Sequence, residues 1–322
     1  MAGQAEIFLA QAELAEGRSP LYARLWRELA DDTRVAAVVG PDPAWDAPLR
    51  LMAGVHYLVL TGEAAWERIG DVLVEHRAFL REWVATRGVQ TNEVQRCWSL
   101  LPCFLEAVRR TGADTFDLVE LGPSAGLNLA WDRYGYSFGN GSWYSAGAKL
   151  RLSGDEERRV PPQLLDLRPA VRSRTGIDRS PIDVTSDEAA LLLKSFVWAD
   201  QTERLDRLDA AIEAVRADPP DLIQGDLAER LPEILEGLRD SDALTLVWET
   251  AVLGYVPEDG RRRLYDTIVR FGEQHPIAFV QTRRASSGVM AHFGLNLQLP
   301  PLEPEEVAFA THHGDWLDWL AR

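Results

Sequence analysis

The stretch from Phe116 to Asp132 constrains the fold more than any other part of the chain. It reads FDLVELGPSAGLNLAWD: an apolar run interrupted by Glu120, then a glycine-rich turn, then apolar residues at helical spacing. An apolar run of this length is typical of a buried strand. Strand, glycine turn and helix together begin a βαβ unit, in which a ligand can approach bare backbone amides at the start of the helix.

The residues of this turn narrow the class of ligand. A dinucleotide-binding turn follows the pattern GxGxxG, whereas Ser124 and Leu127 occupy the second and third glycine positions here. Glu120, two residues before the first glycine, would repel a pyrophosphate and attract an ammonium group. S-adenosylmethionine (SAM) has an amino group, a sulfonium and no phosphate, so an acidic strand end suits it. The alternative is an ordinary strand-to-helix turn of another α/β protein.

Composition and charge set the broad class of the protein. The chain has 322 residues, 46% of them hydrophobic, and can bury a large core in one domain with an appendage or in two domains. Its formal net charge of −16 argues against a nucleic-acid or anionic-membrane partner. There is no basic region before an apolar run at the N-terminus and no run of 18 apolar residues, so we expect a soluble, reduced, cytoplasmic protein.

The first third of the chain is expected to be helical. Residues 1 to about 112 carry apolar residues at helical spacing, and Ser19 followed by Pro20 is typical of a helix start. The sequence therefore predicts a helical N-terminal domain over residues 1–112 and an α/β domain over residues 113–322.

A polar cluster lies near the end of this helical part. Its members are Gln90, Thr91, Asn92, Glu93 and Arg96. One interpretation is a helix start, with Asn92 as the cap and Gln95 completing a pair like a capping box. The other is a catalytic role, because Asn92 and Arg96 are one helical turn apart and could orient an acceptor or the methionyl end of SAM. Both interpretations stay open.

After the glycine turn, residues 133–170 are rich in glycine and aromatic residues, and Lys149 to Leu152 alternates like a strand. We expect a hairpin insertion here. Its aromatic side chains either form a wall for a substrate or pack on the core.

The segment ELGPSAG resembles motif I of the class I SAM-dependent methyltransferases, in the variant ExGxxxG. The resemblance implies a set of cofactor-binding residues: Glu120, Gly122, Ser124, Gly126 and Asn128. It also implies that the second strand ends in an acidic residue that accepts hydrogen bonds from the ribose hydroxyls. Asp178 matches this place, although more residues than usual separate it from Gly126.

The third strand is expected to end at Gly225 and Asp226. This pair resembles the methyltransferase position whose carboxylate accepts a hydrogen bond from the exocyclic amine of adenine. Each acidic residue also has a simpler interpretation. Asp178 could be a turn residue before Pro181, and Asp226 an Asx turn or a helix N-cap.

The fourth strand is predicted over Ala243 to Thr250, a continuous apolar run before Glu249. Its end is where this superfamily positions reacting groups, so Glu249 or Tyr255 could act as an acid or base. A carboxylate that caps the following helix is the alternative for Glu249. The N/D-P-P-Y signature of amino-directed methyltransferases is absent. We expect no metal, because His312 and His313 would point to opposite faces of a strand.

Several motifs together are similar to an uncharacterised bacterial domain-of-unknown-function family, number 2332, over nearly the whole chain. They are RGVQTNE, ELGPSAGLNLxWDRY, GIDxxPxDV, QxxRxxRLDAAI, GDL and YVP. That family is grouped with SAM-methyltransferase-like folds. The resemblance implies an α/β fold: a doubly wound, seven-stranded, class I methyltransferase-like (Rossmann-like) sheet after a helical domain, with an antiparallel hairpin from residues 292–299 and 307–312 at its edge.

The expected function is SAM-dependent methyl transfer to an unidentified small-molecule acceptor, with SAM across the carboxyl ends of the first strands. The alternatives are a non-catalytic protein that binds SAM or another nucleoside as a sensor, and a binding module without a nucleotide. The sequence does not indicate the oligomeric state.

Overall fold

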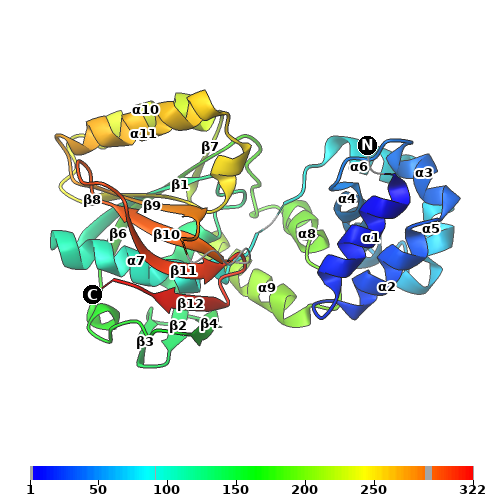
Figure 1. The fold of residues 1–322 in the computed structure, drawn as a ribbon, viewed down its shortest axis with the longest axis horizontal. Helices are drawn as coiled ribbons and strands as arrows, with labels where there is room; N and C mark the ends of the chain where they lie inside the picture. Colours follow the sequence, from blue (N-terminus) through cyan, green and yellow to red (C-terminus); the bar gives the residue numbers. More distant parts are fainter. Residues whose placement is uncertain (1–2, 91, 287–291, 322) are drawn as a thin grey trace. The chain divides into compact units, whose positions relative to one another are not determined.

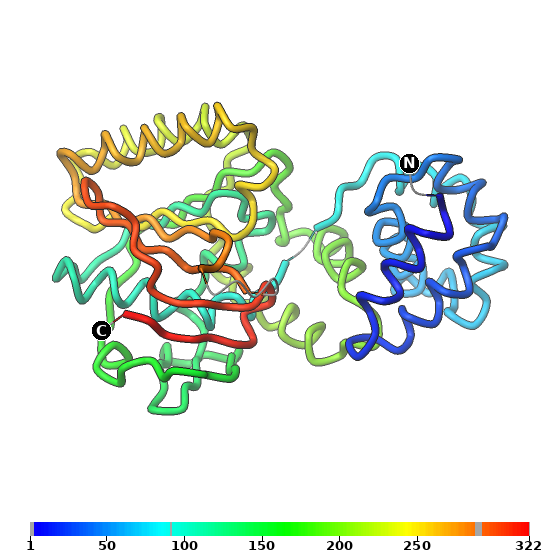
Figure 2. The backbone as a smooth tube through the Cα atoms, in the orientation of Figure 1, coloured from blue at the N-terminus to red at the C-terminus, as the bar shows by residue number. Residues whose placement is uncertain are grey.

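The computed structural model describes residues 3–90, 92–286 and 292–321. They form two compact units, each built from two separate stretches of chain. One unit contains residues up to 92 and residues 185–209, and the other contains residues 93–184 and 210 onward. Figure 2 traces this path, in which the green segment after residue 185 returns to the blue helices.

The first unit is helical, as its amphipathic pattern predicts. Its helices are α1 (Gln4–Ala15), α2 (Pro20–Leu29), α3 (Thr33–Val39), α4 (Ala47–Leu60), η1 (Trp66–Arg68), α5 (Ile69–Glu75), α6 (Arg77–Thr86), α8 (Asp187–Ser195) and the start of α9 (Thr202–Ala217).

The returning segment is held at the start of α2. Ser19 caps α2 by accepting a hydrogen bond from the amide of Tyr22 at 3.1 Å, and its hydroxyl donates to Asp200 Oδ1 at 2.6 Å. Trp198 packs on Tyr22 and Trp26, with ring centroids 5.5 and 5.6 Å apart. The helical unit therefore needs residues from both stretches to complete its core. The expected boundary at residue 112 differs from this division.

The second unit is built on a sheet of nine strands within the described residues, in the order β5-β12-β11-β10-β9-β8-β1-β6-β7 (Figure 1). The strands are β1 (Thr115–Leu121), β5 (Asp155–Glu156), β6 (Ala170–Asp178), β7 (Asp221–Gln224), β8 (Leu244–Glu249), β9 (Ile277–Arg284), β10 (His292–Gln298), β11 (Glu305–Thr311) and β12 (Trp316–Trp319). Strands β7, β6, β1, β8 and β9 are parallel neighbours, and β9 to β12 form an antiparallel meander.

The α/β class and the large, mostly parallel sheet are confirmed, but the sheet has nine strands instead of the seven expected. Two features account for the difference. The meander runs through β10, β11 and β12 in sequence order, and the short strand β5 from the insertion pairs with β12. The expected antiparallel pair near the C-terminus is present as β10 and β11.

Helices cover both faces of this sheet. On one face lie α10 (Leu227–Gly237) and α11 (Glu258–Gly272), whose apolar side chains pack on Val119, Ile177 and Phe279 of the strands. Figure 1 shows these two helices side by side. Helix α7 (Arg96–Thr111) packs against β9, β10 and β11.

The insertion forms a small three-stranded sheet, in which β2 (Gly135–Phe138) and β3 (Gly141–Tyr144) make an antiparallel hairpin and β4 (Arg151–Ser153) pairs with β2. Tyr134, Tyr136 and Trp143 are buried. These three aromatic residues therefore pack on the core, whereas Tyr144 is exposed and a wall for a substrate stays a prediction.

Among the described residues, no helix is both long and apolar enough to span a membrane.

Candidate functional site

The candidate site lies at the carboxyl ends of the parallel strands. The chain continues from β1 to β6 and β7 on one side and then crosses to β8 and β9 on the other, so the strand order reverses beside β1. In open α/β sheets a ligand site is expected outside the strand ends at such a reversal. The segments that follow β1, β6, β7 and β8 meet at this edge because the four strands are parallel.

The turn after β1 is tight but offers fewer bare amides than expected. Gly122, Ser124 and Gly126 have positive φ angles of 74°, 52° and 71°. Their amides already donate within the chain, to Ile177 O at 2.9 Å, to Asp178 Oδ2 at 2.9 Å and to Pro123 O at 3.0 Å respectively. The turn is followed by the 3₁₀ segment η2 (Asn128–Arg133), not by an α-helix. The predicted α-helix after the turn was therefore wrong, and binding of a ligand to the remaining amides of the turn stays a prediction.

The glycines of this turn are required by the protein's own packing. A Cβ atom at Gly122 would lie 2.5 Å from a methyl carbon of Val252, and one at Gly126 would lie 2.7 Å from Pro220 Cγ. Both distances are too short for a stable contact. The turn therefore needs glycine at both positions whether or not a ligand binds there.

Gly126→Ala is accordingly expected to lower the free energy of unfolding by about 1–3 kcal/mol, from left-handed backbone strain and overpacking. Urea denaturation followed by circular dichroism measures this change. Gly254→Ala is the matched control, because no atom lies within 4 Å of a Cβ there and its φ is not in the left-handed range. Equal stability of the two variants would contradict the packing role of Gly126.

Glu120 is the most unusual residue at this edge. It is 1% exposed, and its Oε1 accepts a hydrogen bond from Asn128 Nδ2 at 3.4 Å. Its Oε2 has no hydrogen-bond partner among the described residues. Burial raises the pKa of Glu120 to about 8, and Asn128 offsets only part of that rise. Trp248 also lowers this pKa, although its indole nitrogen makes no hydrogen bond of ordinary geometry.

Arg96 extends from the start of α7 toward the ends of β1 and β8. Its Nε donates to His312 O at 2.9 Å, and its Nη1 donates to Thr250 Oγ1 at 3.4 Å. Its charge also lowers the pKa of Glu120. Arg96 therefore lies at the edge that carries the glycine turn.

The rest of the polar cluster is arranged differently from the capping interpretation. Helix α7 begins at Arg96, and its N-cap Gln95 makes no side-chain capping bond, so the predicted pair of Asn92 and Gln95 does not form a capping box. Asn92 belongs to the helical unit, whereas Glu93 and Arg96 belong to the sheet unit. Thr91 lies outside the described residues.

Asp178 and Asp226 both bind backbone amides. Asp178 lies at the end of β6 and accepts from the amides of Ser124 and Ser180, each at 2.9 Å. Asp226 is the N-cap of α10, accepting from Ala228 at 3.0 Å, and its other oxygen pairs with Arg179 at 3.2 Å. The simpler interpretation of Asp226 as a cap therefore holds, and its adenine-binding role stays a prediction.

Glu249 is completely buried at the end of β8, and its two oxygens accept four hydrogen bonds. The donors are the amides of Val252 and Leu253 at 3.1 and 3.4 Å, and the amide and hydroxyl of Thr282 at 2.6 and 2.8 Å. These bonds fix η4 (Val252–Tyr255) to the end of β9. Tyr255 is 74% exposed. Two of these four bonds fit the capping interpretation and the other two join Glu249 to β9, while a role as acid or base stays a prediction.

Three residues that the sequence did not single out as a group complete this edge. Buried Glu93 accepts from the amide of Gln95 at 3.3 Å and contacts His313 Nδ1 at 3.3 Å. Gln95 donates to the carbonyls of Ser153 and Gly314, at 2.8 and 3.2 Å. The turn between β11 and β12 is thereby fixed on the start of α7. The sequence analysis placed Glu93 in the polar cluster and Gln95 in the capping pair, and it considered His313 only with His312 as a metal ligand.

The described residues contain no cluster of three or more His, Cys, Asp or Glu side chains that could hold a metal ion. The thiol of Cys97 donates to Asn128 Oδ1 at 3.2 Å, and burial raises its pKa well above the ordinary value. Cys97 therefore stays a neutral donor that fixes Asn128.

A family model described as "Uncharacterized protein conserved in bacteria (DUF2332)" matches residues 5–319. No curated protein matches the chain.

Proposed function

The chain belongs to the bacterial family DUF2332, and we propose that its sheet unit binds S-adenosylmethionine and promotes transfer of the methyl group to a small molecule. The unpartnered Oε2 of buried Glu120, beside the glycine turn, is the observation that carries this proposal. An ammonium group placed there would donate the missing hydrogen bond and balance the charge. A phosphate would be repelled by the same carboxylate.

The surrounding arrangement supports this assignment. The order β7-β6-β1-β8-β9 is that of a doubly wound parallel sheet, and a class I methyltransferase-like core would use this part of it. Asp178 lies on the neighbouring strand end, and each of its oxygens keeps a lone pair beyond the amide that it binds. Those lone pairs could accept ribose hydroxyls without breaking the turn.

In this proposal SAM supplies the activated methyl group, and the protein contributes binding and orientation. Glu120 would hold the ammonium, while Asn128, fixed by the thiol of Cys97, holds Glu120 in place. Arg96, near the end of β8, would orient an acceptor or the methionyl carboxylate. Direct displacement at a methyl group needs mainly proximity and alignment, so the missing N/D-P-P-Y signature does not argue against transfer.

Affinity for SAM should depend on pH through Glu120. Because the carboxyl group is mostly neutral below its pKa of about 8, binding an ammonium must first ionise it. Between pH 6 and 7 the α-amino group of SAM stays largely protonated, so affinity should rise about tenfold over that interval. Calorimetry at the two pH values, in buffers of different ionisation enthalpy, measures the affinity and the proton released on binding.

Glu120→Gln is the matched variant for this test. It should bind SAM more weakly and with little change in affinity between pH 6 and 7. A wild-type affinity that is constant over this interval would remove Glu120 as the ammonium partner, and failure to bind SAM at any pH would reject the proposal.

A sensor without catalysis is the second candidate function. The saturated hydrogen bonding of Glu249 favours it, because the fourth strand then presents no available carboxylate. Incubation of the protein with SAM and a bacterial small-molecule extract distinguishes the two functions. Protein-dependent release of S-adenosylhomocysteine supports the transferase, whereas tight binding without release supports the sensor.

A further inference from the structure

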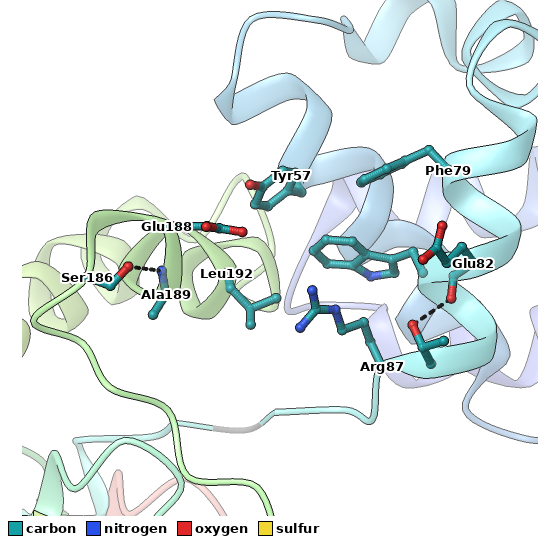
Figure 3. A pocket seen from close by; sticks show the side chains of 10 residues that line it. Tyr57, Phe79, Glu82, Arg87, Ser186, Glu188, Ala189 and Leu192 are labelled. Atoms are coloured by element: carbon teal, nitrogen blue, oxygen red, sulfur yellow. Dashed lines mark hydrogen bonds between the residues drawn. The ribbon is translucent and has the colours of Figure 1, made fainter.

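The helical unit contains a cavity of about 450 Å³ that takes no part in the proposed SAM site. Side chains from α4, α6 and α8 line it, together with Arg87, the residue after α6 (Figure 3). All of them belong to the helical unit: Tyr57, Phe79, Glu82, Trp83, Thr86, Arg87, Ser186, Glu188, Ala189 and Leu192. The cavity is thus complete within one unit.

Helical spacing explains how these residues share one cavity. Phe79, Glu82, Trp83 and Thr86 stand at positions i, i+3, i+4 and i+7, so they lie on one face of α6. Glu188 and Leu192, one turn apart on α8, point toward the side chains of α4 and α6 in Figure 3. Two helices of one unit therefore face each other across this space.

One wall of the cavity is aromatic. The ring centroids of Tyr57 and Trp83 are 5.0 Å apart, those of Phe79 and Trp83 are 5.4 Å apart, and Tyr57 and Phe79 stack at 6.1 Å. The three rings pack on one another, so a ligand would lie against this surface rather than between the rings. The guanidinium of Arg87 lies over the Trp83 ring at 5.4 Å, which shows that this aromatic face accepts a cation.

Two further observations concern the polar groups. Trp83 is 5% exposed, and its indole N–H has no acceptor among the described residues. The carboxylates of Glu82 and Glu188 form no ion pair within the part of the chain that the structure describes. The cavity is lined by these two carboxylates and by one guanidinium, that of Arg87, which lies over the Trp83 ring. The charged groups of its lining therefore sum to a net negative charge.

We propose that this cavity binds a small organic ammonium ion with an apolar body and a hydroxyl or other oxygen acceptor. The apolar body would pack on Tyr57 and Phe79, and the ammonium would bind the carboxylates of Glu82 and Glu188. The oxygen of the ligand would accept a hydrogen bond from the indole N–H of Trp83.

Four related probes test the charge of the ligand: phenylalaninol, a cation with a hydroxyl; 3-phenyl-1-propanol, which is neutral; phenylalanine, a zwitterion; and 3-phenylpropionate, an anion. Binding to the full chain is measured by calorimetry and saturation-transfer NMR. Phenylalaninol should bind at least about tenfold more tightly than the anion, because the cavity carries net negative charge. Equal binding, tighter binding of the anion or zwitterion, or binding of none of the four would overturn the proposal.

Variants locate the probe in the cavity. Glu82→Gln combined with Glu188→Gln should weaken phenylalaninol binding about tenfold, while Glu67→Gln, an exposed carboxylate of the same unit outside the cavity, should leave it unchanged. Arg87→Gln should strengthen binding, because it removes a like charge and exposes the face of Trp83. Weaker binding to the Arg87→Gln protein would indicate an anionic ligand and reject the assignment. Circular dichroism establishes that each variant is folded.

Discussion

Glu120→Gln is expected to raise the free energy of unfolding at pH 8 by about 2–4 kcal/mol, and to weaken SAM binding in the same protein. The folded-state pKa of Glu120, about 8, is raised from 4.5 by burial. Between these values the folded protein holds a proton that the unfolded chain has released, so stability falls as pH rises. Glutamine stays neutral, so the variant does not lose stability as the pH rises. Burial of the glutamine amide has its own cost and offsets part of this gain in unfolding free energy.

Urea denaturation at pH 5 and pH 8 measures the effect. The advantage of the Glu120→Gln protein should shrink by about 3 kcal/mol at pH 5, where the folded carboxyl group is neutral and the unfolded one is only partly ionised. Glu106→Gln provides the opposite control. Burial raises the pKa of Glu106, but hydrogen bonds from Arg109 and Arg110 outweigh it and lower the pKa, so this substitution should destabilise the protein at pH 8. A Glu120→Gln protein less stable than wild type at pH 8 would show that the carboxylate is satisfied in the folded state.

Glu249→Ala should be among the most damaging single substitutions, costing about 3–5 kcal/mol of unfolding free energy. It leaves the amides of Val252, Leu253 and Thr282 without their acceptor, and each unsatisfied buried donor costs about 1–3 kcal/mol. It also leaves a void beneath η4. Thermal and urea unfolding measure the loss.

Tyr255→Phe is the control for this experiment, because Tyr255 is exposed and its ring remains in the variant. It should leave stability within about 0.5 kcal/mol of wild type. A stable Glu249→Ala protein that binds SAM but releases no S-adenosylhomocysteine would instead assign Glu249 a chemical role.

The strands of the sheet could be predicted because burial on both faces leaves a continuous apolar run. The runs at Phe116–Leu121, Ala243–Thr250 and Ile277–Gln281 correspond to β1, β8 and β9 with small differences at their ends. The segment after Gly126 could not be predicted in this way. Its apolar spacing fits an α-helix, but Tyr134 and Tyr136 donate to the carbonyls of Leu127 and Trp131 and hold a 3₁₀ conformation.

The chemistry of the carboxylates was equally hard to predict. Glu120, Asp178, Asp226 and Glu249 all stand at strand ends in the sequence, which is why they were considered together. Their difference lies in the donors that the fold supplies: several backbone amides for Glu249 and Asp178, and one weak amide contact for Glu120. Spacing predicts the position of such a residue at the sheet edge. It does not predict the distant donors, such as Thr282 for Glu249 and Ser124 for Asp178, which the fold brings to the carboxylates.

The alternation of the two units along the chain has a consequence for biosynthesis. A ribosome delivers α1 to α6 first, then β1 to β6, and only afterwards the residues 185–209 that complete the helical unit. Domains made of one continuous stretch can fold as they emerge. Here the earliest helices must wait, with part of their apolar surface uncovered, until more than half of the polypeptide has been made. Ribosome-bound chains ending before residue 185 should therefore recruit chaperones that the released full-length chain no longer needs.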